Sequence, residues 1–270
     1  MGDSMTSGTV DYEITGHVAV ITINRPEKRN AITADMFESL RRIWHEFRAD
    51  DEARVAVVTG AGDISFSAGA DLGDDGVIEL DPAQRHAAFL ADHTYNYGNL
   101  PEEGMPLWKP TIAAVNGYCI GAGLTLAAGM DIRIASANAS FAFPEVQWGV
   151  PTITGAILLG RVMPTSTASL MLLSGAAITA EEAHTSGLVS EVTNGNDVKQ
   201  RALAIAERIA TNAPVAVRAT KEAMIRGLDM PFERSFAFGE YLRRVALDSA
   251  DADEGLRAFR ERRTPHFEGR

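Results

Sequence analysis

The sequence predicts an α/β fold with a helical C-terminal region. Short apolar segments rich in β-branched residues alternate with segments of helical spacing up to about residue 192, which is typical of strands and helices packed in layers. From residue 197 to 262 the spacing is almost entirely helical. A chain of 270 residues with 46% hydrophobic composition can bury a large core as one domain with a small appendage.

The predicted strands lie in the first part of the chain. Residues 10–15 and 17–24 alternate in polarity and are joined at Gly16, which indicates two paired strands. Residues 54–60 and 111–117 are short apolar runs that end in glycine, the pattern of strands buried on both faces. Further strands are predicted at residues 131–136 and 139–143.

Capping residues mark the predicted helices. Residues 33–48 place apolar side chains at helical spacing and begin with a threonine that suits an N-cap. Thr179 and Glu182 have the spacing of a capping box. Pro214 suits the first position of a helix, and Gly227 suits its end.

Composition limits the partners of the protein. A formal net charge of −11 gives no general attraction to nucleic acid or to an anionic membrane surface. No run of about 18 apolar residues predicts a membrane span. Cys119 is the one cysteine, so no internal disulfide framework is predicted and a cytoplasmic location is expected. No metal-ligand spacing is present, so no metal is expected, and residues 1–9 are predicted to be a disordered tail.

Two segments have the residues for stabilising an anion. SFSAGADL (65–72) and NGYCIGAGLTLAAGMDI (116–132) each place glycine beside small residues after an apolar strand. In the second segment a helix follows, and the first N–H groups of a helix have no intrahelical partner. Two such N–H groups from different loops, aimed at one point, would form an oxyanion hole. On local spacing alone, tight turns and close packing explain such glycines more often.

Six segments in the same order resemble the crotonase family, the enoyl-CoA hydratases and isomerases. They are the two above together with NRPEKRNAI (24–32), FPEVQWGV (143–150), ITAEEAHTSGLVSEV (178–192) and EGLRAFRERR (254–263). The resemblance implies a crotonase-like spiral core of ββα turns over residues 10–200 and a C-terminal helical trimerisation region over residues 201–270. It also implies a homotrimer or a dimer of trimers.

The resemblance also implies an acyl-CoA substrate and no cofactor, since coenzyme A is part of the substrate. Removing a proton beside a thioester carbonyl, or adding water to an α,β double bond, places negative charge on the carbonyl oxygen. Two preorganised donors would stabilise that enolate. The family's two donors match the backbone N–H groups of Ala70 and Ala122.

A proton-transfer group is the second requirement. Hydratases of the family use two glutamates; one matches Glu145, whereas the other falls on Thr125, which cannot act as a carboxylate. One carboxylate suffices to move a proton between C2 and C4 of a 3-enoyl thioester, so isomerisation is favoured over hydration, with Glu145 as the single base. Thr125 and Trp148 are secondary site candidates, and aromatic packing is the commoner role for Trp148.

Coenzyme A binding is predicted at a basic island in this acidic chain. Arg25, Lys28 and Arg29 suit contact with phosphates, and a solvated loop explains them equally well. By resemblance, Phe259 and Arg262 contact the coenzyme A of a neighbouring subunit. The remaining coenzyme A contacts implied by resemblance are at Ala31, Ala68, Gly69, Asp71, Leu72 and Gly121.

Two other functions stay open at this point. The same enolate chemistry supports thioester hydrolysis, decarboxylation or C–C cleavage, and the unusual proline-containing segment around Trp108 motivates this alternative. A non-catalytic acyl-CoA binder would explain the loss of one acid.

Overall fold

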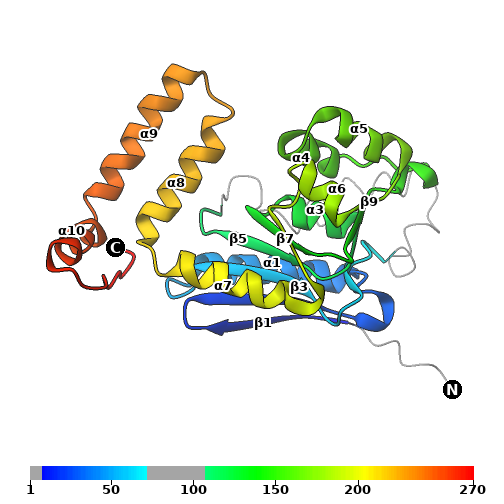
Figure 1. The fold of residues 1–270 in the computed structure, drawn as a ribbon, viewed down its shortest axis with the longest axis horizontal. Helices are drawn as coiled ribbons and strands as arrows, with labels where there is room; N and C mark the ends of the chain where they lie inside the picture. The colour runs from blue at the N-terminus through cyan, green and yellow to red at the C-terminus, as the bar shows by residue number, and fades with distance from the viewer. Residues whose placement is uncertain (1–7, 72–106) are drawn as a thin grey trace.

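The computed structural model describes residues 8–71 and 107–270, and two sheets form its centre (Figure 1). The larger sheet has the order β1 (Thr9–Thr15), β2 (Val18–Asn24), β3 (Val55–Gly60), β5 (Thr111–Val115), β7 (Ile132–Ser136) and β10 (Glu191–Thr193). The smaller sheet has the order β4 (Ser65–Ser67), β6 (Tyr118–Ile120), β8 (Ser140–Ala142) and β9 (Ile178–Thr179). Neighbouring strands are parallel except for the antiparallel pairs β1–β2 and β8–β9.

The two faces of the larger sheet pack against different helices, because successive side chains of a strand point to opposite faces. Val55 and Val57 of β3 belong to one buried cluster with α7 (Val198–Ala210). Ala56 and Val58 belong to a second cluster with α1 (Ala34–Ala49) and the smaller sheet. Both faces of β3 are therefore covered, which explains why all of its residues are buried and why it begins with four apolar side chains.

The remaining core helices lie around the smaller sheet. They are α3 (Ala122–Ala128), α4 (Thr154–Val162), α5 (Thr165–Ser174) and α6 (Ala180–Thr185). Short 3-10 turns occur at Pro26–Lys28 (η1), Glu145–Trp148 (η3) and Gly195–Asp197 (η4), of which η4 contacts α7 and β7. The predicted capping box is confirmed, since Thr179 accepts from the Glu182 N–H while the Glu182 carboxylate accepts from the Thr179 N–H.

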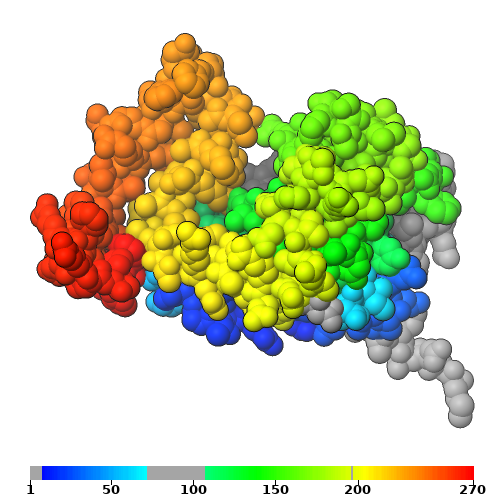
Figure 2. All heavy atoms as spheres, viewed as in Figure 1, coloured from blue at the N-terminus to red at the C-terminus, as the bar shows by residue number. Residues whose placement is uncertain are grey.

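The C-terminal helices form an arm on one side of the core. α8 (Pro214–Gly227) and α9 (Phe232–Leu247) pack against each other, and α10 (Ala250–Glu261) follows. Figure 2 shows this arm separated from the α4–α6 region by a notch. The boundary predicted between residues 200 and 201 falls inside α7, which covers the sheet, so the arm begins at α8. Residues 1–7 of the predicted tail lie outside the described part, and Thr9 already belongs to β1.

In the part of the chain that the structure describes, no helix is long and apolar enough to cross a membrane.

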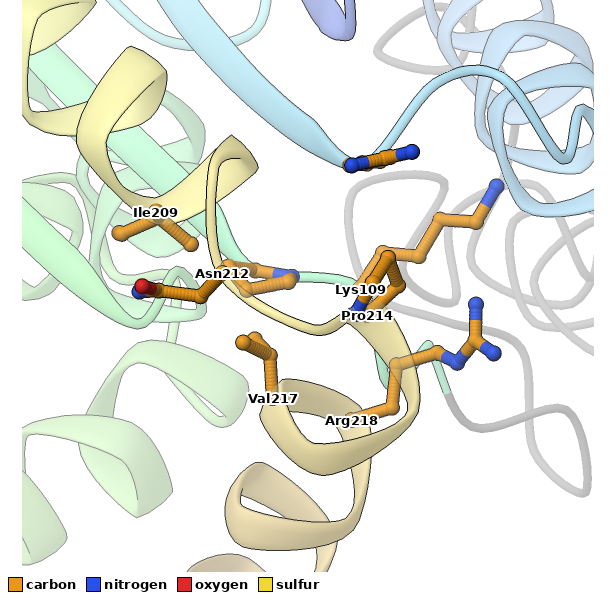
Figure 3. Close-up of a pocket in the computed structure, with 8 residues that line it drawn as sticks. Lys109, Ile209, Asn212, Pro214, Val217 and Arg218 are labelled. Atoms are coloured by element: carbon orange, nitrogen blue, oxygen red, sulfur yellow. The ribbon is translucent and has the colours of Figure 1, made fainter. Parts of the chain in front are cut away.

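Polar contacts anchor the arm where α8 leaves the core. The Lys221 ammonium lies 2.7 Å from the Asp131 carboxylate and also donates to the Lys109 carbonyl at 2.9 Å. The same Asp131 oxygen accepts the N–H and the hydroxyl of Thr111 at the start of β5. A small open pocket lies at this junction (Figure 3). Its lining includes Lys109, Ile209, Asn212, Pro214, Val217 and Arg218.

The Lys221–Asp131 ion pair is expected to hold the arm in place. Lys221→Met should lower the free energy of unfolding by about 3 kcal/mol, because it leaves a largely buried carboxylate without its counter-charge. Urea unfolding measures this, and adding Asp131→Asn should recover part of the loss. The control is Arg161→Met, which breaks the exposed pair with Asp229 and should cost less than about 1 kcal/mol. An equally small cost for Lys221→Met would contradict the anchoring role.

Candidate active site

Two glycine-containing turns meet at one end of the smaller sheet. β4 and β6 are parallel neighbours, so the turns that follow them emerge at the same edge. Gly69 has φ +98° and Gly121 has φ +54°, both in the region that favours glycine. A Cβ built on Gly69 would lie 3.4 Å from the amide nitrogen of Ala122, and one on Gly121 would lie 3.9 Å from the Cα of Gly69. The two turns are therefore in direct contact.

The N–H of Ala70 is directed away from its strand partner. Ala70 forms a parallel bridge with Ile32, in which the Ile32 N–H donates to Gly69 and the Asp71 N–H donates to Ile32. Successive peptide groups of an extended chain point to opposite edges, so the Ala70 N–H points to the other side. Within residues 8–71 and 107–270 this N–H donates no hydrogen bond.

The N–H of Ala122 is unpaired for a different reason. Ala122 is the first residue of α3, where an N–H has no intrahelical acceptor. No other acceptor among the described residues takes it. The positive φ values at this site belong to Gly69 and Gly121 and not to the two alanines, so neither alanine is strained.

A carboxylate lies beside the second turn. Glu145 opens the short turn η3, and its Oε1 is 3.1 Å from the position that a Cβ on Gly121 would occupy. Its Oε2 is shielded from solvent and has no hydrogen-bond partner within the described part. An enclosed carboxylate oxygen without a partner is available to a bound molecule. Trp148 follows three residues later in the same 3-10 turn, where residues i and i+3 eclipse, and it is 74% exposed.

The basic island divides into one buried and two exposed residues. Arg25 is 5% exposed and forms an ion pair with Asp71, so it links the two loops on which these residues lie. Lys28 and Arg29 are exposed, and the Arg29 guanidinium lies 5.5 Å from the ring centre of Tyr118. Of these three basic residues, only Lys28 and Arg29 present their charges to solvent.

The other predicted coenzyme A contacts are distributed over three regions. Ala31 and Ala68 are half-buried on neighbouring loops, and the Ala68 N–H donates to the Arg29 carbonyl at 3.0 Å. Leu72 lies outside the described residues. Phe259, which is 83% exposed, lies in α10, and Arg262 is its C-cap. Figure 1 places α10 at the left end of the molecule, on the far side of the arm from α3, so α10 does not adjoin α3 within one chain.

Two buried asparagines hold the loops next to the site through hydrogen bonds to backbone groups. Asn30 accepts from the Arg25 N–H and donates to the carbonyls of Ala61 and Ser65. Asn116 bonds both the N–H and the carbonyl of Gly60. Sequence reasoning missed both residues. The available signal for Asn30 is its residue type, because asparagine tolerates the left-handed conformation that it adopts here, with φ +56°.

Comparison with known proteins identifies the family to which this chain is similar. The model of the enoyl-CoA hydratase/isomerase family matches residues 13–270. The (E)-benzylidenesuccinyl-CoA hydratase of Thauera aromatica is 42% identical over 96% of this chain and 99% of its own length. The short-chain-enoyl-CoA hydratase of Clostridium acetobutylicum is 35% identical over 96% of this chain and 97% of its own. The crystal structure of an enoyl-CoA hydratase from Bacillus anthracis superposes with a TM-score of 0.87, at 32% identity, covering 98% of this chain and 100% of that one.

The contact between Gly121 and Glu145 gives a testable requirement. Gly121→Ala should reduce turnover of enoyl-CoA by about 10-fold or more, because the added methyl displaces the carboxylate. The matched control is Gly16→Ala, which has a similar φ of +58° but open space around it. Both variants place a Cβ at a positive φ and should lose stability, so rates are compared at a temperature where both are folded. Steady-state kinetics and thermal melts compare them. Full activity in Gly121→Ala would show that the close contact does not matter.

Proposed function

Because this chain belongs to the enoyl-CoA hydratase/isomerase family, we propose that it hydrates a 2-enoyl-CoA at the site described above. The observation that supports this most is the meeting of two unpaired N–H groups and one enclosed carboxylate at a single pair of turns. The fold is that of solved enoyl-CoA hydratases, and the predicted α/β crotonase-like architecture is confirmed. The chain is an acyl-CoA-processing enzyme.

The thioester carbonyl is placed against Ala70 and Ala122. Attack at C3 of the enoyl group moves an electron pair toward the carbonyl oxygen, which becomes an enolate oxygen. The two N–H groups point at this oxygen before the reaction begins, so no reorganisation is needed when charge develops. Each donor of this kind contributes about 3 kcal/mol to the transition state. This pair of amides therefore forms the oxyanion hole in our proposal.

Glu145 is the group that transfers protons between the attacking water and C2. Its carboxylate accepts a proton from the attacking water as the oxygen bonds to C3, and it then gives a proton to C2 of the enolate. Water adds across the double bond and the carboxylate returns to its starting state, so no cofactor is required. A positioned carboxylate of this kind contributes about 10²–10⁴-fold to the rate.

Hydration replaces isomerisation as the favoured reaction. The substitution at Thr125 favoured isomerisation, since one carboxylate suffices for it. The relatives named above are hydratases, and a carnitinyl-CoA dehydratase from Citrobacter koseri is named for the reverse type of reaction. These names support water addition, and they do not favour hydrolysis, decarboxylation, C–C cleavage or a non-catalytic binder.

Coenzyme A is placed along the loops that carry the exposed cations. Lys28 and Arg29 face solvent beside the site loops and suit contact with phosphates. Arg25 acts indirectly, by fixing the Asp71 loop through their ion pair. We expect the enzyme to act in the cytoplasm, where its single cysteine, Cys119, stays reduced.

A trimer or a dimer of trimers is the proposed assembly. The C-terminal arm exposes apolar side chains that a single chain leaves uncovered. They are Met224, Leu228, Phe232, Phe236, Tyr241 and Phe259. Association through the arm would bring Phe259 and Arg262 near the coenzyme A of a neighbouring subunit.

Replacing Glu145 tests its proposed role as the base. Glu145→Gln should lower the hydration rate of crotonyl-CoA by about 10³-fold, because an amide cannot accept the proton of the attacking water. The control is Glu181→Gln in the exposed first turn of α6, which should keep full activity. Spectrophotometric loss of the enoyl absorbance measures both. Comparable rates in the two variants would refute Glu145 as the base.

Sedimentation tests the assembly. The 29.0-kDa chain should sediment as three or six copies. Phe236→Asp should shift it toward smaller species, because a charge would then be buried at the contact. Ile14→Asp in β1 is the control, since Ile14 is exposed outside the arm. A monomeric wild-type protein would contradict the proposed assembly.

A further inference from the structure

Thr125 lies on the one face of α3 that opens to the site. Of the residues in α3, all are buried except Ala122 and Thr125, which are partly exposed. Residues three apart share a face of a helix. The face that begins with the unpaired Ala122 N–H therefore continues to the side chain of Thr125.

The Thr125 hydroxyl forms no hydrogen bond with residues 8–71 or 107–270. Hydroxyls inside helices commonly donate to the carbonyl four residues earlier, as Thr220 does to Ala216 at 2.8 Å. For Thr125 that carbonyl belongs to Gly121 and accepts the Thr125 N–H at 2.9 Å. The hydroxyl itself bonds to nothing among the residues that the structure describes. It is thus free to bind a small polar molecule.

Glu145 and Thr125 are both linked to the same glycine, Gly121. Glu145 Oε1 is 3.1 Å from the position that a Cβ on Gly121 would occupy, and Thr125 lies one helical turn beyond Gly121, whose carbonyl accepts the Thr125 N–H. Glu145 Oε2 is enclosed and without a partner. Among the described residues, two polar groups without protein hydrogen-bond partners thus belong to residues that adjoin Gly121.

We propose that the Thr125 hydroxyl holds the attacking water beside Glu145, as a positioning group that makes a single carboxylate sufficient for hydration. This inference rests on the proposed function. A water held by one carboxylate can rotate about that hydrogen bond, whereas a second contact fixes the direction of its lone pair toward C3. The water oxygen bonds to C3, one water proton passes to Glu145, and Glu145 delivers a proton to C2. Thr125 neither gains nor loses a proton in the cycle.

The test separates water addition from enolate formation. Thr125→Val removes the hydroxyl and keeps the shape, and Thr125→Ser keeps the hydroxyl. Hydration of crotonyl-CoA is measured beside exchange of the α-protons of butyryl-CoA with D₂O. Butyryl-CoA has no double bond to hydrate, so its exchange needs the oxyanion hole and Glu145 but no attacking water.

Thr125→Val should lower kcat for hydration by about 10- to 100-fold with little change in KM, while its α-proton exchange stays close to wild type. Thr125→Ser should keep most of the hydration rate, and thermal melts should show that both variants are folded. Unchanged hydration in Thr125→Val, or equal loss of hydration and exchange, overturns this inference alone. If the wild-type enzyme hydrates no 2-enoyl-CoA, the proposed function falls and the inference falls with it.

Discussion

The close contact between two glycine turns is the constraint on which this site depends. Gly69 and Gly121 lie so near each other that a side chain on either would meet backbone or the Glu145 carboxylate. The contact brings together two turns about fifty positions apart in the chain, and in our proposal the amides of Ala70 and Ala122 at these turns share one acceptor. Parallel pairing of β4 with β6 delivers both turns to the same edge. The chemistry we propose uses the backbone of these turns, in which the side chains of Ala70 and Ala122 have little part.

Buried polar side chains keep the turns in register with the larger sheet. Asn116 forms two hydrogen bonds with the backbone of Gly60 at the end of β3. Asn30, in the loop that also carries Lys28 and Arg29, donates to the Ser65 carbonyl in β4. Each of these amides is satisfied by backbone groups, so its burial stabilises one arrangement of the loops over others. The Arg25–Asp71 ion pair adds a third connection between the same two loops. Preorganisation of the site therefore begins outside the residues that would touch substrate.

Five of the six strands of the larger sheet and most helices could be predicted because each element carries its own signal, whereas β10, with three residues, was not predicted. Thr179 caps α6 and Pro214 opens α8 as the sequence indicates. The smaller sheet could not be predicted in full, since β4 has three residues and β9 has two, too short for any periodicity. Residue spacing could not reveal that Glu145 approaches Gly121, because their contact depends on the tertiary fold. The resemblance to a family supplied Ala70, Ala122 and Glu145 as candidates, and it led to isomerisation where the relatives favour hydration.

A crystal structure with a non-reactive acyl-CoA bound would test the central claim most directly. The thioester oxygen should lie about 2.7–3.1 Å from the amide nitrogens of both Ala70 and Ala122, with the Glu145 carboxylate facing C2 and C3. An acyl-CoA whose carbonyl oxygen meets neither amide, or whose reacting carbons lie out of reach of Glu145, would contradict the account.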